Sequence, residues 1–385
     1  MYPTISDLIK DLFGIYIPLP IQSFGFMMAV SFFFAAWTLA MELKRKEKAG
    51  LLFPVKKNVI EGAPATILDL ILNALGGFIV GYKLVAIVLD YKSFVGDPQS
   101  FLLSTRGNLL GGAALGIILL YLKYREKEKQ RLPQPEKRQI EIYPHQLVGD
   151  ITIVAAVSGL LGAKIFDNLE HIDSFIADPI TSLLSFSGLT FYGGLIFGAI
   201  AVLYFARKNK ISVLHLADAA APGLILAYGI GRIGCQLAGD GDWGIVNFNP
   251  KPSWFFFPHW AWAYNYPHNV IQEGIAIPDC VGKFCYQLAH PVYPTPLYET
   301  TAALLIFFFL WSIRKKIRVP GMIFSIYLLL NGIERFLVEL IRVNVQYHFM
   351  GINATQAEII GVVMVVLGIT GILFFQKRYA LKQLK

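Results

Sequence analysis

Residues 357–375 read AEIIGVVMVVLGITGILFF, a run of 19 residues with one charged side chain, Glu358. A helix needs about 20 apolar residues to cross the hydrocarbon core of a bilayer. Similar runs recur along the 385 residues, of which 55% are apolar and 16% are charged. Soluble domains typically contain about 25% charged residues. The sequence therefore predicts an all-α, polytopic membrane helix bundle.

The basic residues are concentrated between the apolar runs. Of the 34 Lys and Arg residues, 24 fall in five stretches, at 42–57, 123–138, 207–210, 314–318 and 376–385. The positive-inside rule predicts that these stretches face the cytoplasm. The basic residues are not interleaved with stacking aromatic residues, so the net charge of +8 does not indicate a nucleic-acid partner.

This orientation predicts nine spans, with the N-terminus outside and the C-terminus in the cytoplasm. We place the spans at about 21–41, 66–89, 107–122, 151–170, 188–206, 212–231, 298–313, 320–341 and 357–375. Residues 235–297 form a long periplasmic loop within a single membrane domain, 1–385. The first 20 residues lack the basic start and apolar stretch of a cleavable signal peptide, so we expect the first span to insert the chain.

The chain contains three cysteines. Cys280 and Cys285 lie in the loop 235–297, where an oxidising compartment permits a disulfide, and two free thiols are the alternative. Their spacing is not C-x-x-C, and no second pair exists, so we expect no zinc site. Cys235 stands apart from both.

The sequence contains an internal repeat. Residues 81–107 align without gaps on residues 162–188, with 10 identities in 27 positions at an offset of 81. Lys83 corresponds to Lys164, and one residue of slip brings Gly111-Gly112 onto Gly193-Gly194. We therefore expect residues 66–124 to be a duplicated hairpin, a copy of 147–207 in the same orientation. Parallel repeats also occur in transporters, which keeps a transport function open.

Ionisable residues occur within the predicted spans. Each costs at least about 2.5 kcal/mol at the membrane centre unless it is paired or faces a polar cavity. A polar cavity open toward the outer leaflet accounts for them, and its cations suit an anionic head group. For Asp69, Asp150 and Asp218 the alternative is a position at the interface between membrane and water. The residues are Asp69, Lys83, Asp150, Lys164, Asp218, Glu334, Arg335 and Glu339, with Arg232 and Glu299 near outer ends.

Residues 227–244, AYGIGRIGCQLAGDGDWG, are one-third glycine. Because each glycine costs about 1 kcal/mol relative to alanine in a helix interior, we expect a helix end that unwinds into a tight loop. Exposed amides beside Arg232 make a phosphate site, since arginine offers bidentate donors and stays charged. Close helix packing through small residues is the alternative, and it leaves Arg232 unexplained.

Three further segments are expected at the same outer level. Residues 189–195 (LTFYGGL) open the fifth span, 290–299 (HPVYPTPLYE) open the seventh, and 331–342 (NGIERFLVELIR) end the eighth. In the last segment Arg335, Glu339 and Arg342 fall on one helical face. The candidate residues in the other two are Tyr192, Gly193, Gly194, Tyr298 and Glu299.

These segments resemble the prolipoprotein diacylglyceryl transferase family. GRIGCQLAGDGDWG is similar to that family's signature, approximately GRIGNFINGExWG. TFYGGL, HPVYPTPLYE and ERFLVELIR are similar to its HGGL, HPxQLYE and RFxVEFFR segments, in the same order. The resemblance runs from about residue 21 to 375. Seven spans are usual in the family, so nine agree with seven plus an inserted hairpin.

The resemblance implies a reaction. The family transfers the diacylglyceryl group of phosphatidylglycerol to the thiol of a lipobox cysteine in prolipoprotein signal peptides and releases glycerol phosphate. The enzymes act in the bacterial cytoplasmic (inner) membrane, facing the outer leaflet, and the expected partners are phosphatidylglycerol, prolipoproteins and membrane lipid. By motif position Arg232 and Arg335 stabilise the phosphate and leaving group. No cofactor and no metal are expected.

The remaining candidates follow from motif positions. We expect Tyr192 and Asp240 beside the two arginines at the catalytic centre. The expected residues for binding phosphatidylglycerol are Arg232, Gly193, Gly194, Gly231, Gly234, Lys164, Tyr298, Glu299 and Glu339.

The sequence departs from the family at several positions. Tyr192 stands where the family often has a histidine, Cys235 replaces an asparagine and Asp240 a glutamate. Because tyrosine has a pKa near 10, the proton acceptor is open among Asp240, His290 and positive charge alone. We expect no covalent role for Cys235. The competing function is a catalytically silent relative that binds or moves phospholipid.

Overall fold

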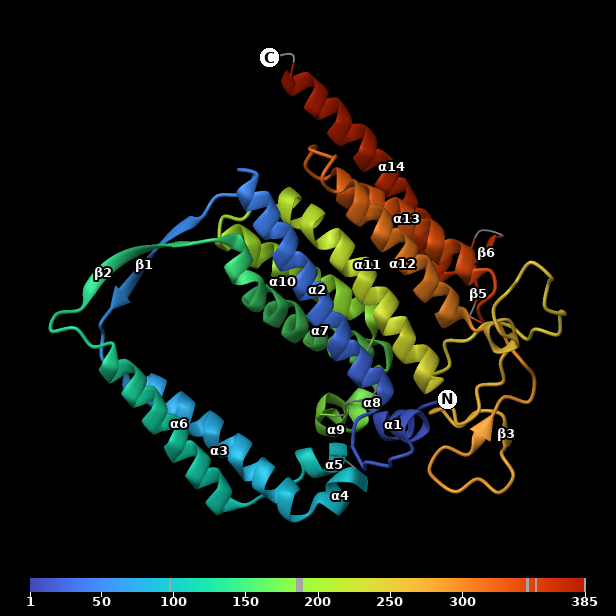
Figure 1. Ribbon diagram of the computed structural model, residues 1–385, viewed down its shortest axis with the longest axis horizontal. Helices are drawn as coiled ribbons and strands as arrows, with labels where there is room; N and C mark the ends of the chain where they lie inside the picture. Colours follow the sequence, from blue (N-terminus) through green and yellow to red (C-terminus); the bar gives the residue numbers. More distant parts are fainter. Residues whose placement is uncertain (97, 185–189, 344–345, 350–351, 384–385) are drawn as a thin grey trace.

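The computed structural model describes residues 1–96, 98–184, 190–343, 346–349 and 352–383. Most of these residues are helical, and nine helices within them have at least 18 residues (Figure 1). The nine are α2 (Ser23–Lys48), α3 (Ile67–Leu89), α6 (Leu109–Lys129), α7 (Val148–Glu170), α10 (Phe191–Lys208), α11 (Val213–Ala238), α12 (Thr295–Ile313), α13 (Met322–Glu339) and α14 (Gln356–Gln383). The shorter helices are α1 (Ile5–Phe13), α4 (Tyr91–Gly96), α5 (Pro98–Leu103), α8 (Ile172–Ala177) and α9 (Pro179–Leu184), with 3-10 turns at Pro144–Leu147 and His259–Ala261.

Six of the described helices are long and apolar enough to cross a membrane, namely α2, α3, α7, α11, α12 and α14. Their lengths and composition confirm a helical, multi-pass membrane protein. The other three long helices, α6, α10 and α13, also coincide with predicted spans. The number of nine crossings and the orientation of the chain stay predictions. The start of the predicted fifth span, including Leu189, lies outside the described residues.

The central helix of the bundle is α11. It packs along α2 and α12 and also touches α13, which pairs with α14 (Figure 1). Its small residues allow close contact, since a Cβ at Gly229 would lie 3.0 Å from Ala303 of α12. Apolar residues of α11, α12 and α13 form one buried cluster, consisting of Ala221, Ile225, Ala303, Leu310 and Ile323. This packing fixes the three helices relative to one another.

The glycine-rich segment differs from the prediction. Helix α11 does not unwind near Ala227 but continues to Ala238, where Gly239 ends it in the left-handed conformation at φ +63°. The glycines inside the helix face neighbours closely, because a Cβ at Gly234 would lie 3.3 Å from the Cα of Phe24 in α2. Tight packing offsets the cost of the glycines, and the alternative of packing through small residues is correct for this part.

Asp69 and Asp218 act as caps at helix starts. Asp69 forms a capping box with Thr66 at the start of α3. Asp218 of α11 accepts hydrogen bonds from the amides of Gly321 and Phe324 at the start of α13, at 2.8 and 3.0 Å. Asp150 is exposed in the first turn of α7. Two of the three aspartates therefore have a structural partner.

Two helical hairpins share one plan. Helices α3, α4 and α5 begin and end 81 residues before α7, α8 and α9. In the first hairpin a Cβ at Gly81 would lie 2.3 Å from the carbonyl of Gly111, and in the second a Cβ at Gly162 would lie 2.5 Å from the carbonyl of Gly193. Both crossings therefore need glycine. The domain division and the duplication stay predictions.

Six short strands form three antiparallel pairs, none of which the sequence analysis predicted. β1 (Val55–Glu61) pairs with β2 (Glu136–Ile142), β3 (Ile275–Ala276) with β4 (Tyr286–Gln287), and β5 (Gln346–Phe349) with β6 (Ile352–Thr355). The β1–β2 ribbon joins the α3–α6 hairpin to the bundle (Figure 1). The sequence analysis counted part of each strand only as a basic stretch, and β1 (VKKNVIE) lacks the regular alternation of apolar and polar residues that predicts a strand.

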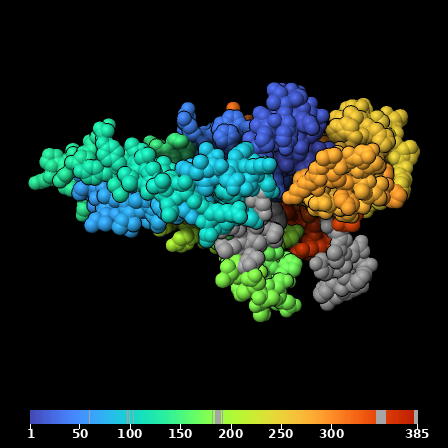
Figure 2. All heavy atoms as spheres, turned by 90° about the horizontal axis from the view of Figure 1, so that it is seen from below, coloured from blue at the N-terminus to red at the C-terminus, as the bar shows by residue number. Residues whose placement is uncertain are grey.

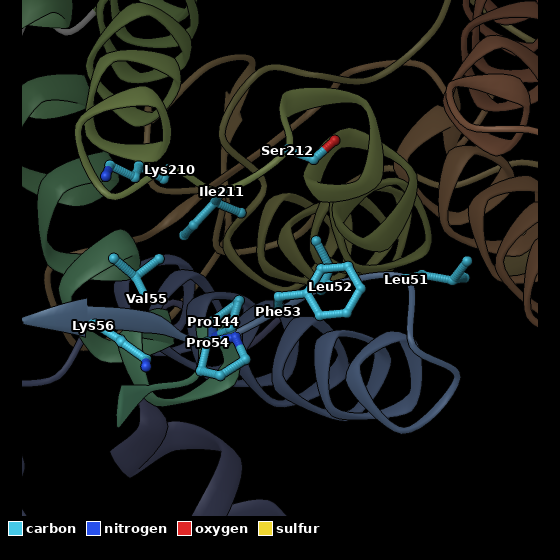
Figure 3. Close-up of a pocket in the computed structure, with 10 residues that line it drawn as sticks. All are labelled: Leu51, Leu52, Phe53, Pro54, Val55, Lys56, Pro144, Lys210, Ile211 and Ser212. Carbon is cyan, nitrogen blue, oxygen red and sulfur yellow. The ribbon is translucent and has the colours of Figure 1, made fainter. Parts of the chain in front are cut away.

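The bundle has two different ends. At the loop end, residues 239–294 and the N-terminal segment lie together, as Figure 2 shows in orange and dark blue. There the amide of Tyr2 donates to the carbonyl of Leu237, at 3.0 Å. The structure also contains the disulfide Cys280–Cys285, the first of the two predicted alternatives. At the opposite, basic end lie the C-terminal part of α14 and a cavity of about 330 Å³ lined by Lys56 and Lys210 (Figure 3).

Candidate functional site

The candidate site is built around Arg232, which lies six residues before the end of α11. Its guanidinium forms an ion pair with Asp242 in the following loop, and it lies 5.1 Å from the ring centroid of Tyr228. The side chain is 15% exposed. A guanidinium held by a carboxylate and an aromatic face at a helix end is fixed in place but still reachable from outside.

Glu299 joins the arginines of two helices. This side chain of α12 is fully buried, with an exposed fraction of 0%. Its Oε2 lies 2.6 Å from Nε of Arg232, and its Oε1 lies 3.5 Å from a terminal nitrogen of Arg335 in α13. Oε2 accepts no hydrogen bond within the described part of the chain. The Nε–H of Arg232 therefore does not point at this oxygen, and the contact is an ion pair only. One carboxylate therefore sets the spacing of two guanidinium groups.

Arg335 is only loosely held. Its second ion pair, to Glu339 one turn later, spans 3.8 Å. Both of its ion pairs are longer than a hydrogen bond, which for an N–H donor is about 2.7–3.2 Å. The side chain is 21% exposed. Donors of this guanidinium are thus available to a further acceptor.

Arg342 closes the cluster from the other side. It is 7% exposed, and it pairs with Oε1 of Glu299 at 3.3 Å and with Asp242. We call the set Arg232, Arg335, Arg342, Asp242, Glu299 and Glu339 the loop-end cluster. It joins α11, α12, α13 and the loop after α11, so it depends on the packing of all four.

Backbone contacts hold that loop in place. The amide of Gly244 donates to the carbonyl of Tyr293, and the amide of Ile245 donates to the carbonyl of Ile341, both at 2.8 Å. A Cβ at Gly244 would lie 2.5 Å from the latter carbonyl. Thr295, the first residue of α12, donates its hydroxyl to the carbonyl of Asp242 at 2.7 Å. The final glycine of the signature is therefore needed for the loop to approach α13.

Two carboxylates of the loop have opposite pKa shifts. Burial raises the pKa of Asp242, but the positive charges of Arg232 and Arg342 outweigh this, and the net shift is downward. For Asp240 burial dominates, the negative charge of Asp242 adds to it, and the pKa is raised. Asp242 is thus the permanent anion between the arginines, whereas Asp240 takes up a proton more readily than an ordinary aspartate.

Other polar groups near the cluster lack hydrogen bonds. Glu334 of α13 is 6% exposed, and neither of its carboxylate oxygens has a hydrogen-bond partner among the described residues. The buried hydroxyl of Tyr228 also lacks one within the same part of the chain. Buried polar atoms are usually satisfied, so such groups indicate strain, function or an absent ligand.

Four expected residues belong to the α7–α10 hairpin, namely Lys164, Tyr192, Gly193 and Gly194. Lys164 is buried and lies 3.5 Å from Asp167. Gly193 packs against Gly162, and Tyr192 lies in the first turn of α10. The ion pairs of the loop-end cluster involve neither helix of this hairpin. In the other hairpin Lys83 donates to carbonyls at the turn, at 2.5–3.1 Å, which is a structural role.

The remaining expected residues support the site from its edges. A Cβ on Gly194 would lie 3.1 Å from the carbonyl of Gly159 in α7, so this glycine also serves the hairpin crossing. Gly231 and Gly234 face α2, near Met28 and Met27. The hydroxyl of Tyr298 donates to the carbonyl of Ala261 at 3.0 Å and so anchors the long loop on α12.

Cys235, Asp240 and Asp242 offer three possible ligand atoms within 4.8 Å of one another. Two arginines already compensate the charge of Asp242, and Arg232 also lies 3.8 Å from the sulfur of Cys235. A cation placed there would be repelled by these guanidinium groups.

The family model for prolipoprotein diacylglyceryl transferase matches residues 129–374, which include every member of the loop-end cluster. The chain belongs to this family. The matched region begins at Lys129, the last residue of α6, so α1 and α2 as well as the α3–α6 hairpin lie before it. Arg232 and Arg335 are thus placed on a transferase framework.

Individual relatives of the family agree. A phosphatidylglycerol–prolipoprotein diacylglyceryl transferase from Leptospira interrogans is 29% identical over 222 residues, 50% of this chain and 61% of the relative. One from Chlorobaculum tepidum is 29% identical over 282 residues, 69% of this chain and 84% of the relative. A transferase numbered 2 in Clostridium perfringens is 29% identical over 236 residues, 59% and 75% of the two chains. The chain thus matches about three-fifths of the length of the Leptospira relative.

Sequence reasoning missed part of the cluster. The sequence analysis placed Arg342 on the correct helical face but did not name it as a candidate. It did not single out Asp242, because the resemblance pointed to Asp240. The segment 231–244 is one residue longer than the family's approximate signature, which makes the position of its acidic residue ambiguous. Glu334 was noted only as an ionisable residue within a span.

Proposed function

We propose that this protein transfers the diacylglyceryl group of phosphatidylglycerol to the lipobox cysteine of prolipoproteins and releases glycerol phosphate. The observation that carries the proposal is that Arg232 and Arg335, from separate helices, lie on the two oxygens of Glu299. Two guanidinium groups at fixed spacing match the several oxygens of one phosphate. The names of the relatives supply the substrates.

In the proposed reaction the thiolate sulfur of the acceptor attacks a carbon of the diacylglyceryl group, namely the glycerol carbon that is bonded to the phosphate through oxygen. A carbon–sulfur bond forms, the carbon–oxygen bond breaks, and its electron pair leaves on the phosphate oxygen of glycerol phosphate. The charge on the leaving group grows from one to two negative charges. Arg335 has donors to spare for that added charge, and Arg232 holds the phosphate, so both act at the transition state. Glu299 and Arg342 are positioning residues.

The thiol must lose a proton, and we assign this proton to Asp240. Its raised pKa makes it a better base than an ordinary aspartate, and it lies in the partly exposed loop beside Arg232. Because the base acts in its deprotonated form, activity rises with pH through the pKa of Asp240. Tyr192 and His290 are the alternatives, and His290 is exposed beside Phe248, with ring centroids 5.2 Å apart.

A replacement tests this assignment. Asp240→Asn keeps the shape of the side chain but is expected to lower transfer by about 100-fold or more. The measurement is the rate of glycerol phosphate release between mildly acidic and alkaline pH. An Asp240→Asn variant with the rate and the pH profile of the wild type contradicts the assignment and directs attention to Tyr192.

The proposed setting is the bacterial inner membrane, with the loop end at the outer leaflet and the basic end in the cytoplasm. Phosphatidylglycerol would enter from the membrane, and the lipobox peptide would arrive on the outer side. Reporter fusions at the end of α14 and in the loop 239–294 check the orientation. The proposal requires cytoplasmic reporter activity for the first fusion and outside activity for the second.

Purified protein in phosphatidylglycerol micelles, assayed with and without a lipobox peptide, tests the function itself. Release of glycerol phosphate that depends on the peptide is the expected result. A protein that binds the lipid but releases nothing with the peptide is instead the silent relative. Replacing the peptide's cysteine by serine provides the control, because a hydroxyl is a far weaker nucleophile than a thiolate at neutral pH.

A further inference from the structure

A second cavity opens at the basic end, opposite the loop-end cluster. Its volume is about 730 Å³, and its walls come from the end of α2, the start of α11, the α12–α13 loop and the last turns of α14. Leu51 lines both this cavity and the smaller cavity of Figure 3. The start of α11 also contributes to the walls of both cavities. Four elements that are distant in sequence thus converge on one opening.

The charge of this cavity has one sign. Its lining contains four cationic residues, Arg45, Lys315, Arg318 and Arg378, and no Asp or Glu among the residues that form its walls. Arg45 shares the buried Glu42 with Arg314. For Lys315, Arg318 and Arg378 no carboxylate lies within ion-pair distance in the described ranges. Three uncompensated cations therefore face a common space.

The start of α11 adds polar groups that favour an anion. Ser212, which lines the smaller cavity, precedes the helix without a side-chain hydrogen bond to its first amides, so the positive end of the 26-residue helix is uncapped there. Leu214 and His215, in the first turn of the same helix, line the larger cavity. The uncapped helix start therefore lies beside this cavity, where it favours an anion.

The rest of the wall is apolar. Phe375 and Tyr379 of α14 and Ile317 and Val319 of the α12–α13 loop contribute to it. A small hydrated anion gains nothing from such a surface, whereas an amphiphile places its phosphate on the cations and its chains along the apolar side. Basic pockets between membrane helices are typical sites for lipid head groups.

We propose that this cavity binds the phosphate of an anionic phospholipid from the leaflet at the basic end. This is a second lipid site, separate from the one in the proposed function and independent of it. Basic residues at the ends of helices set the orientation of the chain through their excess on one side, which requires no shared cavity. What distinguishes these residues is their convergence on a cavity with apolar walls and an uncapped helix.

Matched double variants test the proposal. Arg318→Ala with Arg378→Ala removes two cations that line the cavity. Lys316→Ala with Lys377→Ala removes two exposed cations of the same loop and helix that do not line it. Native mass spectrometry of the detergent-purified protein counts bound phosphatidylglycerol. Since each basic residue near a membrane surface contributes a factor of about five, the first variant should bind one class of lipid roughly 30-fold more weakly, and the second should match the wild type.

Two further arms identify the ligand. Phosphatidylcholine should not compete for the site, and inorganic phosphate should displace the lipid only at far higher concentration. Equal affinity for inorganic phosphate overturns the lipid as ligand, and equal lipid binding by both double variants overturns the site. Size-exclusion profiles and unfolding temperatures check that both variants fold. Because the readout is lipid binding, the result does not depend on transfer activity.

Discussion

The two ends of the helix bundle each contain buried arginines and carboxylates, but they satisfy them differently. At the basic end Glu42 accepts hydrogen bonds from Arg45 and from Arg314, at 2.9 and 3.1 Å. Asp218 accepts two backbone amides and lies 3.7 Å from Lys46. We call the five residues Glu42, Arg45, Lys46, Asp218 and Arg314 the basic-end cluster. It has its hydrogen bonds and needs no ligand.

The loop-end cluster has similar charges but fewer hydrogen bonds. Arg335 is held only at 3.5 and 3.8 Å, and Oε2 of Glu299 lacks a hydrogen bond among the described residues. Buried charges with poor geometry cost stability, because the attraction between them does not repay their desolvation. The comparison shows that ion pairs at one end hold helices together through hydrogen bonds, whereas at the other end both ion pairs of Arg335 are longer than a hydrogen bond, as the proposed phosphate site requires.

The largest expected effect is on catalysis. Arg232→Ala should lower transfer by about 100-fold or more, because it removes a donor to the charge that develops on the leaving phosphate. The rate of glycerol phosphate release, normalised to folded protein, measures it. Arg45→Ala at the basic end is the matched control and should retain transfer. Similar losses for the two variants would remove the distinction between the clusters.

The next effect is on stability. Asp218→Ala removes a buried carboxylate that caps α13 and leaves Lys46 unpaired, so the free energy of unfolding should fall by about 3–5 kcal/mol. Denaturant unfolding in detergent gives the value. Asp218→Asn, which retains one acceptor for the amides, should lose less. Transfer per folded molecule should be unchanged in both, and a selective loss of transfer would assign Asp218 to function instead.

Glu334 is expected to behave in the opposite way. Since neither of its oxygens has a hydrogen bond among the described residues, Glu334→Met should raise the free energy of unfolding by about 1–3 kcal/mol. The same unfolding experiment applies, with Glu42→Met at the basic end as the comparison that should lose stability. If both replacements destabilise the protein, the loop-end cluster is as well satisfied as the other one.

The smallest effect is expected at Cys235. It is 5% exposed and lies 3.8 Å from Arg232, but the proposed reaction uses the thiol of the substrate. Cys235→Ala should cost about 1 kcal/mol of stability and keep substantial transfer. Progress curves for glycerol phosphate release measure this. Complete loss of transfer with normal folding would give Cys235 a chemical role.

The helices were largely predictable from sequence, because a span across a bilayer is a long apolar run with charged ends. The pairing of the charges was less so. Arg232 and Arg335 were found because an arginine within a span needs a reason, and Glu299 because it follows a proline-rich helix start. Asp242 was missed, since an extra residue in the loop hides which aspartate turns inward. The glycines of α11 were taken for unwinding, and only the position of α2 shows that they serve packing.

The β1–β2 ribbon marks a seam in the chain. Val55 and Ile142 are partners at its base, so the two strands leave the bundle and return to it side by side. Residues 56–141 can therefore be excised and replaced by a tight turn without stretching what remains. The shortened chain would retain seven long helices and the family-matched residues from 142 onward, and its behaviour would tell whether the α3–α6 hairpin is an accessory or a requirement.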